Sequence, residues 1–416
     1  MNSDNNNRTT PHLRFPEFSG SWEEKPLSSF LFEHKTKSDG KCEVHSVSVS
    51  KGVVNQVEYL GRSFAAADTS KYNLAKPNDI IYTKSPTGAF PFGIVKQNKN
   101  PYNVIVSPLY AVYTPINKYI GYILDSYFES PAATNNYLSS LIQKGAKNTI
   151  QISNDTFVSK NVCLPTDYAE QKKIALFLSE IDALIAAQGQ KVEALKERKR
   201  GLMQQLFPQP GETTPRLRFP GFAGEWEEKP LGKVADKMNN RNRRLEVSRV
   251  LTNSANEGVV DQSDYFERDI AVKGNTANYH IVEFEDFVYN PRISTAAPVG
   301  PISINKVGKG IMSPLYTIFR FHTGCISFYE QYFQTTIWHP YLKSIANFGA
   351  RFDRMNITSE GFFNMPLFLP SPSEQEKIAS CFSEMDALIA SESAKLESLK
   401  NHKRGLMQQM FPNPTK

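Results

Sequence analysis

The sequence has no long apolar run. No window of about 18 residues is both apolar and free of charge, as a membrane-spanning helix would require. The first residues, MNSDNNNRTTPHLRF, also lack the basic and apolar regions of a secretory signal peptide. We therefore expect a chain with no membrane span and no signal peptide, located in the cytoplasm.

Cysteine is scarce, and its distribution argues against its usual structural uses. The four cysteines stand singly at Cys42, Cys163, Cys325 and Cys381, with no CxxC pair. Two of them have a histidine three residues away, but these pairs lie at unrelated places, so we attribute the spacing to chance. We expect neither a disulfide framework nor a bound metal, in keeping with a reducing cytoplasm.

Motifs of catalysis are absent as well. The sequence has no GxxxxGK[ST] phosphate loop, no HExxH zinc motif and no PD-(D/E)xK spacing. Tyr289-Asn290-Pro291-Arg292 lacks the second proline and the aromatic residue of an adenine methyltransferase tetrad, and we interpret it as a strand end. Gly308-Lys309-Gly310 is too short to hold a pyrophosphate and predicts a turn. We therefore expect no catalysis and no bound cofactor in this chain.

What the chain does have is length, a mild positive charge and an internal repeat. Its 416 residues, 40% of them hydrophobic, suffice for two or more domains, and the net charge of +6 permits an anionic partner without requiring one. TPHLRFPEFSGSWEEKPL begins at Thr10, and TPRLRFPGFAGEWEEKPL begins at Thr214. A second pair of similar blocks, EQKKIALFLSEIDALIAAQGQKVEALKERKRGLMQQLFP and EQEKIASCFSEMDALIASESAKLESLKNHKRGLMQQMFP, begins at Glu170 and Glu374. Both pairs have the same offset, 204 residues.

Between the similar blocks lie two long stretches that share only a skeleton. Gly52-Val53-Val54 recurs as Gly258-Val259-Val260, Asp79-Ile80-Ile81-Tyr82 as Asp286-Phe287-Val288-Tyr289, and Ser107-Pro108-Leu109-Tyr110 as Ser313-Pro314-Leu315-Tyr316. The framework is similar in both copies, whereas the globular parts have diverged. This implies that the framework binds identical partners twice, and that the two globular parts bind different ligands.

The second repeated block predicts one long helix in each copy. Asp167 and Ser371 each stand three residues before a Glu, and Pro372 suits a first helical position. Phe207-Pro208 and Phe411-Pro412 mark the expected ends. A helix of about 37 residues would be about 55 Å long.

Apolar residues recur along both helices at alternating spacings of three and four, which is typical of a coiled-coil seam. The seam positions, which we expect to form the spacer and the subunit interface, are Ile174, Leu178, Ile181, Ile185, Val192, Leu195, Leu202 and Leu206, and Ile378, Phe382, Met385, Ile389, Leu396, Leu399, Leu406 and Met410. Polar residues interrupt the seam at Gln188, Lys199, Glu392 and Lys403. We expect the two helices to pair antiparallel about an approximate two-fold axis, the alternative being that each packs only on its own domain. Gly201 and Gly405 are either close-packing points or early helix ends.

The two diverged stretches mix short β-branched and aromatic runs with helical segments. We expect strands within residues 44–49, 79–83, 103–113 and 285–289, and helices near 135–142 and 328–346. The predicted fold class is α+β, with two mixed domains separated by two long antiparallel coiled-coil helices in an internal pseudo-two-fold repeat. The expected segments are a first domain at 1–165, a first helix at 166–208, a second domain at 209–369 and a second helix at 370–416.

Basic residues cluster early in both diverged stretches. The first cluster contains Lys35, Lys37 and Lys41, and the second contains Lys237, Arg241, Arg243 and Arg244, interleaved with Asn239, Asn240 and Asn242. Second-rank candidates follow a helical segment in each stretch: Lys144 and Lys147, and Arg351 and Arg354. Cations that neutralise phosphates beside amides that read base edges would suit DNA, while for one such loop alone a plain solvated surface is the alternative.

The repeated blocks resemble those of the specificity subunits of type I restriction-modification systems. The resemblance rests on the EQxKIA helix that runs to KRGLMQQ[LM]FP and on the lead-in LRFPxFxGxWEEKPL, and it covers essentially the whole chain. The matching framework positions are Glu170, Gln171, Ile174, Leu184, Leu195, Gly201 and Phe207, and Glu374, Gln375, Ile378, Leu388, Leu399, Gly405 and Phe411.

This resemblance implies a non-catalytic, DNA-reading subunit of a bacterial defence system. Two target recognition domains would each read one half of a bipartite, asymmetric sequence in double-stranded DNA. The helices would fix the distance between the halves and dock two modification subunits, which bind S-adenosylmethionine and methylate adenine. Restriction subunits would add translocation and cleavage that depend on ATP and Mg²⁺.

Two other functions fit parts of the sequence. A coiled-coil adaptor with two protein-binding heads would use the same duplication, and a salt titration of DNA affinity would distinguish it. A self-contained enzyme with a hidden site is the second alternative, and the missing cofactor loops argue against it.

Overall fold

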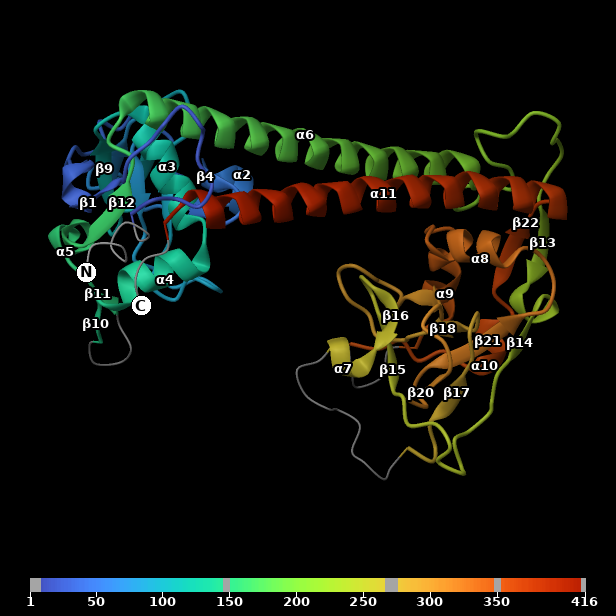
Figure 1. The fold of residues 1–416 in the computed structure, drawn as a ribbon. Helices are drawn as coiled ribbons and strands as arrows, with labels where there is room; N and C mark the ends of the chain where they lie inside the picture. The colour runs from blue at the N-terminus through green and yellow to red at the C-terminus, as the bar shows by residue number, and fades with distance from the viewer. Residues whose placement is uncertain (1–8, 145–149, 266–275, 348–352, 413–416) are drawn as a thin grey trace. The chain divides into compact units, whose positions relative to one another are not determined.

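The computed structural model describes residues 9–144, 150–265, 276–347 and 353–412, and the chain divides into two compact units (Figure 1). Unit 1 contains Met1–Gly189 and Ala394–Lys416, and unit 2 contains Gln190–Ser393. The predicted segment boundaries stay a prediction, because these units are defined by packing and not by order along the chain. No helix among the described residues is long and apolar enough to cross a membrane.

Two long helices, α6 (Tyr168–Leu206) and α11 (Pro372–Met410), each contain 39 residues. Asp167 caps the first, because its Oδ1 accepts the backbone N–H groups of Ala169 at 2.6 Å and Glu170 at 3.1 Å. Both helices end just before the Phe-Pro pairs, as predicted. At 1.5 Å per residue each is about 58 Å long.

Within each unit the start of one long helix packs against the end of the other. In unit 1, Ile174 and Leu178 of α6 share a buried cluster with Met407 and Met410 of α11. In unit 2 the roles are exchanged, since Ile378 and Phe382 of α11 share a cluster with Leu206 and Phe207, at the end of α6. The pairing is therefore antiparallel, and the alternative in which each helix packs only on its own domain is wrong. All sixteen predicted seam residues are buried or half-buried.

Two of the polar residues that interrupt the seam, Lys403 and Lys199, form equivalent ion pairs, one within each unit. Lys403 lies 2.6 Å from Asp182 in unit 1, and Lys199 lies 2.7 Å from Asp386 in unit 2. Burial by itself lowers the pKa of Lys403, but the nearby Glu129 and Asp182 carboxylates outweigh it and raise that pKa above its ordinary value. These charges fix the register of the antiparallel pair, because any shift would leave a buried ammonium unpaired.

Gly201 and Gly405 serve neither of the two purposes expected of them. Both helices run through these positions, and a Cβ atom added at either glycine would meet nothing within 4 Å. They are thus neither helix ends nor points of close packing.

The globular part of unit 1 is an antiparallel arrangement of short strands with helices on its outside (Figure 1). The strands are β1 (Glu23–Pro26), β2 (Leu31–Glu33), β3 (His45–Ser48), β4 (Gly52–Asn55), β5 (Asn73–Ala75), β6 (Ile80–Tyr82), β7 (Val95–Gln97), β8 (Val104–Val106), β9 (Ala111–Pro115), β10 (Gln143–Lys144), β11 (Ile150–Gln151) and β12 (Asn161–Leu164). The helices are η1 (Leu27–Ser29), α2 (Gln56–Leu60), α3 (Lys118–Phe128), α4 (Pro131–Ser139) and α5 (Asn154–Ser159). The largest sheet has the order β2-β9-β6-β7, and the other strands pair as β1-β12, β3-β4, β5-β8 and β10-β11.

Unit 2 repeats this architecture. The strands are β13 (Glu227–Pro230), β14 (Ala235–Lys237), β15 (Leu251–Ser254), β16 (Gly258–Asp261), β17 (His280–Val282), β18 (Phe287–Tyr289), β19 (Ile302–Ile304), β20 (Gly310–Met312), β21 (Thr317–Phe321) and β22 (Pro366–Leu369). The helices are η3 (Leu231–Lys233), α7 (Gln262–Tyr265), α8 (Ile326–Phe333), α9 (His339–Ile345) and α10 (Ser359–Phe363). The four-stranded sheet has the order β14-β21-β18-β19, which matches β2-β9-β6-β7 strand for strand.

Two expectations about helices need correction. The segment predicted as one helix near 328–346 is two helices, α8 and α9, and Pro340 lies in the first turn of the second. Helix α3 was missed, although its residues Ile120, Ile123 and Leu124 are fully buried under the sheet. Its run of aromatic and β-branched residues resembles a strand in the sequence, and only packing against the sheet distinguishes it.

A buried ion pair joins the lead-in segment to the start of each long helix. Arg14 donates from Nε and Nη2 to the carboxylate of Glu170 at 2.6 and 2.7 Å, and Arg218 does the same to Glu374 at 2.7 Å for both bonds. In unit 1 the Trp22 indole donates a third bond to Glu170 at 3.2 Å. The sequence suggested Glu170 and Glu374 as parts of the helix caps. In the structure they instead accept the hydrogen bonds of Arg14 and Arg218.

Replacing Glu170 with Gln should lower the free energy of unfolding by about 2–4 kcal/mol, because the Arg14 guanidinium would lose its buried counter-charge. Glu374→Gln should have a similar effect in unit 2. Denaturant unfolding of each variant measures the change. Glu23→Gln, which removes an exposed ion pair with Lys25, is the control and should leave the midpoint unchanged; an equal loss there would show that burial is not the cause.

Candidate nucleic-acid interface

The first basic cluster lies on a loop that runs beside strand β5. This first basic loop (residues 34–41) is held by two backbone hydrogen bonds, from Leu74 N–H to the Thr36 carbonyl and from Ser38 N–H to the Tyr72 carbonyl, both 2.9 Å. Lys37 stands between them and faces Asn73, the first residue of the strand. Its Nζ donates to Asn73 Oδ1 at 2.6 Å.

The second basic cluster occupies the corresponding place in unit 2. This second basic loop (residues 237–246) is held beside β17 by hydrogen bonds from Ile281 N–H to the Asn240 carbonyl at 2.7 Å and from Asn242 N–H to the Tyr279 carbonyl at 2.9 Å. Arg241 stands between them and faces His280. Lys37 and Arg241 are therefore equivalent positions of two diverged units, an equivalence that the sequence suggested only as a similar offset.

Most of the predicted cations and amides of these loops are exposed. The exposed ones are Lys35, Lys37, Lys41, Lys237, Asn239, Asn240, Arg241, Arg243 and Arg244. Arg241 and Arg243 form no ion pair with any residue that the structure describes, and Arg244 lies 3.7 Å from Glu246. Guanidinium groups without a protein counter-charge are available to an anionic ligand such as a phosphate backbone.

Asn242 is not available for base reading. It is buried, its Nδ2 donates to the Val247 carbonyl at 2.8 Å, and its Oδ1 accepts from Val247 N–H at 3.2 Å. Both ends of the amide are thus used to hold the loop closed. The candidate role for Asn242 is wrong, and Asn239 and Asn240 remain the exposed amides of this loop.

The second-rank candidates are not supported as a group. Arg354 is half-buried, pairs along the backbone with Arg292 and lies 4.0 Å from Asp353. Lys144 lies on β10, of which only the backbone is described, and Lys147 and Arg351 lie outside the described residues.

His280 is a buried residue that faces the second basic loop. Burial lowers the pKa of His280, and the charges of Arg241 and Lys237 lower it further. The imidazole is therefore neutral at neutral pH.

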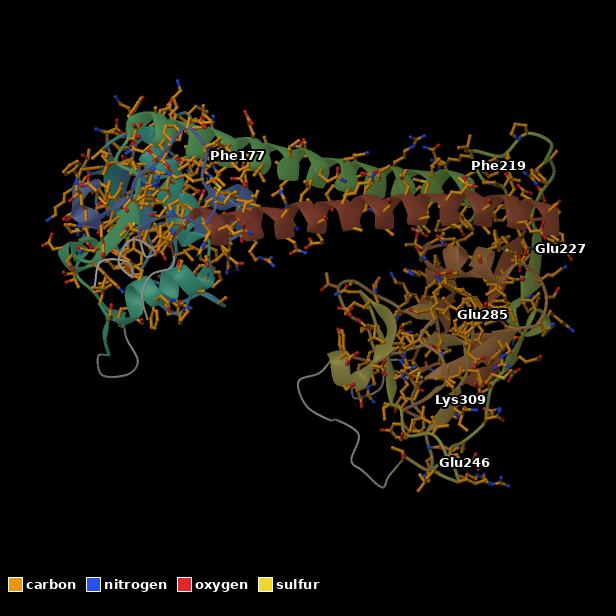
Figure 2. All side chains as sticks on the ribbon, viewed as in Figure 1. Phe177, Phe219, Glu227, Glu246, Glu285 and Lys309 are labelled. Carbon is orange, nitrogen blue, oxygen red and sulfur yellow. The ribbon has the colours of Figure 1, made fainter. Side chains whose placement is uncertain are left out.

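Two further cations near the second basic loop were missed in the sequence. Arg249 and Lys309 line a shallow groove of about 420 Å³ next to Glu246. Figure 2 shows Glu246 at one end of unit 2 and Glu227 at the other. Arg249 pairs with Asp261 at 2.6 Å and Lys309 with Glu283 at 2.8 Å, so both are less available than Arg241. Arg249 and Lys309 lie far apart in the sequence, and only β-strand pairing brings them together. No sequence pattern therefore indicated that they share a surface.

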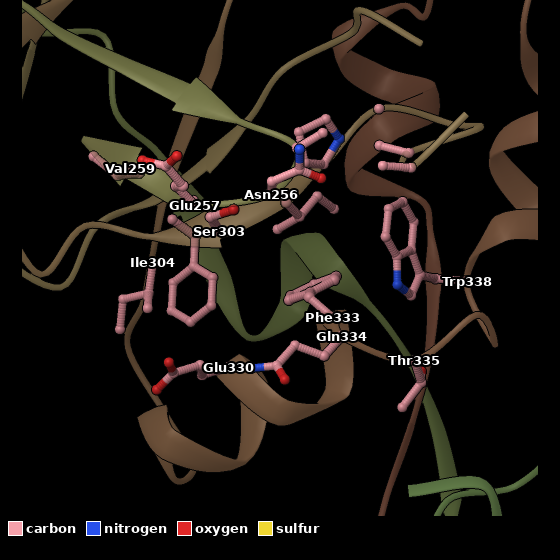
Figure 3. A pocket seen from close by; sticks show the side chains of 18 of the residues that line it. Asn256, Glu257, Val259, Ser303, Ile304, Glu330, Phe333, Gln334, Thr335 and Trp338 are labelled. Atoms are coloured by element: carbon pink, nitrogen blue, oxygen red, sulfur yellow. The ribbon is translucent and has the colours of Figure 1, made fainter. Parts of the chain in front are cut away.

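A cavity of about 680 Å³ lies elsewhere in unit 2, beside the turn that joins β15 to β16 (Figure 3). Its wall includes Phe333, Trp338 and His339. Burial, with the charge of Lys343, lowers the pKa of His339 to about 4, so His339 is uncharged at neutral pH. The lining also contains Glu257 and an ion pair between Lys306 and Glu330 at 2.6 Å. The basic loop adjoins the opposite end of β15, and the cavity is therefore separate from the cationic surface.

All four cysteines are free thiols. Among the described residues, no group of three or more His, Cys, Asp or Glu residues could hold a metal ion. Tyr289 ends strand β18, and Gly308 has a positive φ of 107° in the turn before β20, as the sequence suggested for both segments.

Comparison with known proteins adds evidence from three directions. Residues 31–197 match the profile of the family described as the type I restriction modification DNA specificity domain. A curated relative, the putative type I restriction enzyme MjaX specificity subunit of Methanocaldococcus jannaschii, is 24% identical over 282 residues. That alignment covers 64% of this chain and 62% of the relative's length.

Solved structures share the fold. The type I restriction-modification system S subunit from M. genitalium superimposes with a TM-score of 0.56 at 12% identity, over 98% of this chain and 100% of that one. A chain from a structure of the type I restriction-modification system superimposes with a TM-score of 0.50 at 15% identity, over 95% of this chain and 99% of that one. These findings agree with the resemblance seen in the sequence: residues 31–197 match the type I restriction modification DNA specificity domain, and almost the whole chain shares the fold of these two solved structures.

Proposed function

We propose that this chain is the non-catalytic DNA-recognition subunit of a type I restriction-modification complex. Each unit reads one half of a bipartite, asymmetric target in double-stranded DNA. The observation that carries this proposal is the equivalent placement of Lys37 and Arg241, each between two backbone hydrogen bonds on an exposed loop, in units whose surrounding loops differ. A retained cation suits the uniform phosphate backbone, and diverged neighbours suit two different base sequences.

The division of labour within a loop follows from the chemistry of its side chains. Arg241, Arg243 and Arg244 neutralise phosphates and supply affinity, which makes binding depend strongly on salt. Asn239 and Asn240 are exposed amides that can form paired hydrogen bonds with adenine edges in the major groove. The first loop has lysines and no comparable amides, so its half-site differs.

The repeated helices bind the partner subunits. Leu184 and Leu388 lie at the same position of α6 and α11, outside the seam, and are 58% and 44% exposed. Exposed leucines retained in both copies suit two identical modification subunits, while the length of the helices sets the gap between the half-sites. S-adenosylmethionine, ATP and Mg²⁺ bind to the modification and restriction subunits and not to this chain.

Co-expression with the modification subunit tests the proposal directly. Adenines methylated on plasmid DNA, mapped by long-read sequencing, should form a split motif with a fixed gap. A stable complex that methylates no adenine would contradict the DNA-reading role and favour an adaptor with protein-binding heads.

Replacing Arg241, Arg243 and Arg244 together with Ala should weaken binding to a duplex that carries the mapped motif. The slope of log affinity against log salt should decrease by about 0.9 for each phosphate that the variant no longer neutralises. Fluorescence anisotropy of the assembled complex over a range of salt concentrations measures both. The control removes three cations outside the second basic loop, the exposed Arg216 and Lys233 and the half-buried Lys229, and should leave the slope unchanged. A slope that is the same in both triple variants would place the DNA elsewhere.

Leu184→Asp combined with Leu388→Asp should prevent co-purification with the modification subunits, because each carboxylate would be buried at the interface. Both side chains are exposed in the chain alone, so its melting temperature should not change. Leu176→Asp is the matched control, since Leu176 is exposed on α6 but its counterpart in α11 is Ser380. Normal co-purification of the double variant would remove these leucines from the interface.

A further inference from the structure

A leucine stands exposed at the tip of a turn in unit 1. In Ser107-Pro108-Leu109-Tyr110, the Tyr110 N–H donates to the Ser107 carbonyl at 3.0 Å and the Leu109 N–H donates to Ser107 Oγ at 3.3 Å. These bonds fix the turn, and Leu109 projects from it with 76% of its surface exposed. Its side chain contributes little to the core, so packing does not explain its presence.

Unit 2 has the same turn with the same leucine. In Ser313-Pro314-Leu315-Tyr316, the Tyr316 N–H donates to the Ser313 carbonyl at 3.0 Å and the Leu315 N–H donates to Ser313 Oγ at 3.4 Å. Leu315 is 52% exposed. The turn is thus preserved in sequence and hydrogen bonding, although most of the two stretches has diverged.

Each turn adjoins the basic loop of its own unit. In unit 1 the Asn73 side chain accepts from Lys37 Nζ at 2.6 Å and donates to the Tyr110 carbonyl at 2.8 Å, which connects the loop to the turn. In unit 2 His280 faces Arg241 on one side and pairs with Met312, the residue before the turn, on the other. In both units one strand residue, Asn73 or His280, therefore lies between the exposed cation and the turn that bears the exposed leucine.

We propose that Leu109 and Leu315 are apolar contacts to the DNA, each entering a groove beside the cation of its unit and packing against the bases. This inference rests on the proposed function and names residues of the same surface. A duplex presents phosphates next to apolar groups, namely thymine methyls and the faces of partly unstacked bases. The cation of each unit suits the phosphates, and the neighbouring leucine suits the apolar groups. Because each turn is the same in both units, it makes a contact common to both half-sites, while the diverged loops supply the choice of bases.

The test uses the complete complex with its modification subunits and a duplex that carries the mapped motif. Leu109→Ala and Leu315→Ala should each weaken binding roughly 10-fold, because a leucine side chain would no longer be buried against the DNA. The salt slope should stay at the wild-type value because no charge is removed, unlike in the arginine variant. Leu109→Met should restore most of the affinity, since methionine has a similar apolar volume. Leu60→Ala, an exposed leucine of α2 in unit 1, should bind like wild type.

Three results would overturn the inference. Wild-type affinity of both alanine variants would show that the leucines do not contact DNA. A parallel decrease of affinity and salt slope would mean that the turns act through the basic loops. Dissociation of the modification subunits from the Leu109→Ala complex would identify the turn as a protein contact. A wild-type complex without affinity for the mapped duplex would instead reject the proposed function, and the inference with it.

Discussion

The buried carboxylate at the start of each long helix is the constraint on which the rest of the structure depends. Glu170 and Glu374 are almost completely enclosed, and a carboxylate in that position must be paired. Arg14 and Arg218 satisfy it, and the same lead-in segments are tied to the other helix, where Leu13 N–H donates to the Gln409 carbonyl and Leu217 N–H to the Gln205 carbonyl, both at 2.9 Å. In each unit the ion pair and this backbone hydrogen bond thus join the lead-in segment to the start of one long helix and the end of the other.

The sequence predicted the framework well and the interface only partly. Helix limits, seam and antiparallel pairing followed from periodicity and from two similar blocks, because such patterns repeat the same information many times. Asn242 shows where this approach ends, since a buried asparagine that closes a loop and an exposed one that reads a base look alike in a polar run. The equivalence of Lys37 and Arg241 also depends on strand pairing, which no local pattern contains.

The two units keep one internal design although their surfaces differ. Asp79 and Asp286 are both buried, and each accepts the backbone N–H of the residue three positions earlier at 2.7 Å. Asp79 also bonds His34 at 2.8 Å, whereas Asp286 accepts from Arg320 at 2.7 Å. The need for a paired carboxylate is retained while the partner changes. Substitution can therefore alter the surface of a unit without altering its scaffold.

The way the chain divides between the units sets the order in which their cores can be completed. Unit 2 is one continuous segment, Gln190–Ser393, whereas unit 1 combines a segment that precedes it with one that follows it. The core of unit 1 includes Met407, Met410 and Phe411, all of which come after unit 2 in the chain. During synthesis the first part of unit 1 therefore keeps an apolar surface uncovered until the whole segment of unit 2 has been made. In that interval the uncovered surface is open to chaperones and proteases.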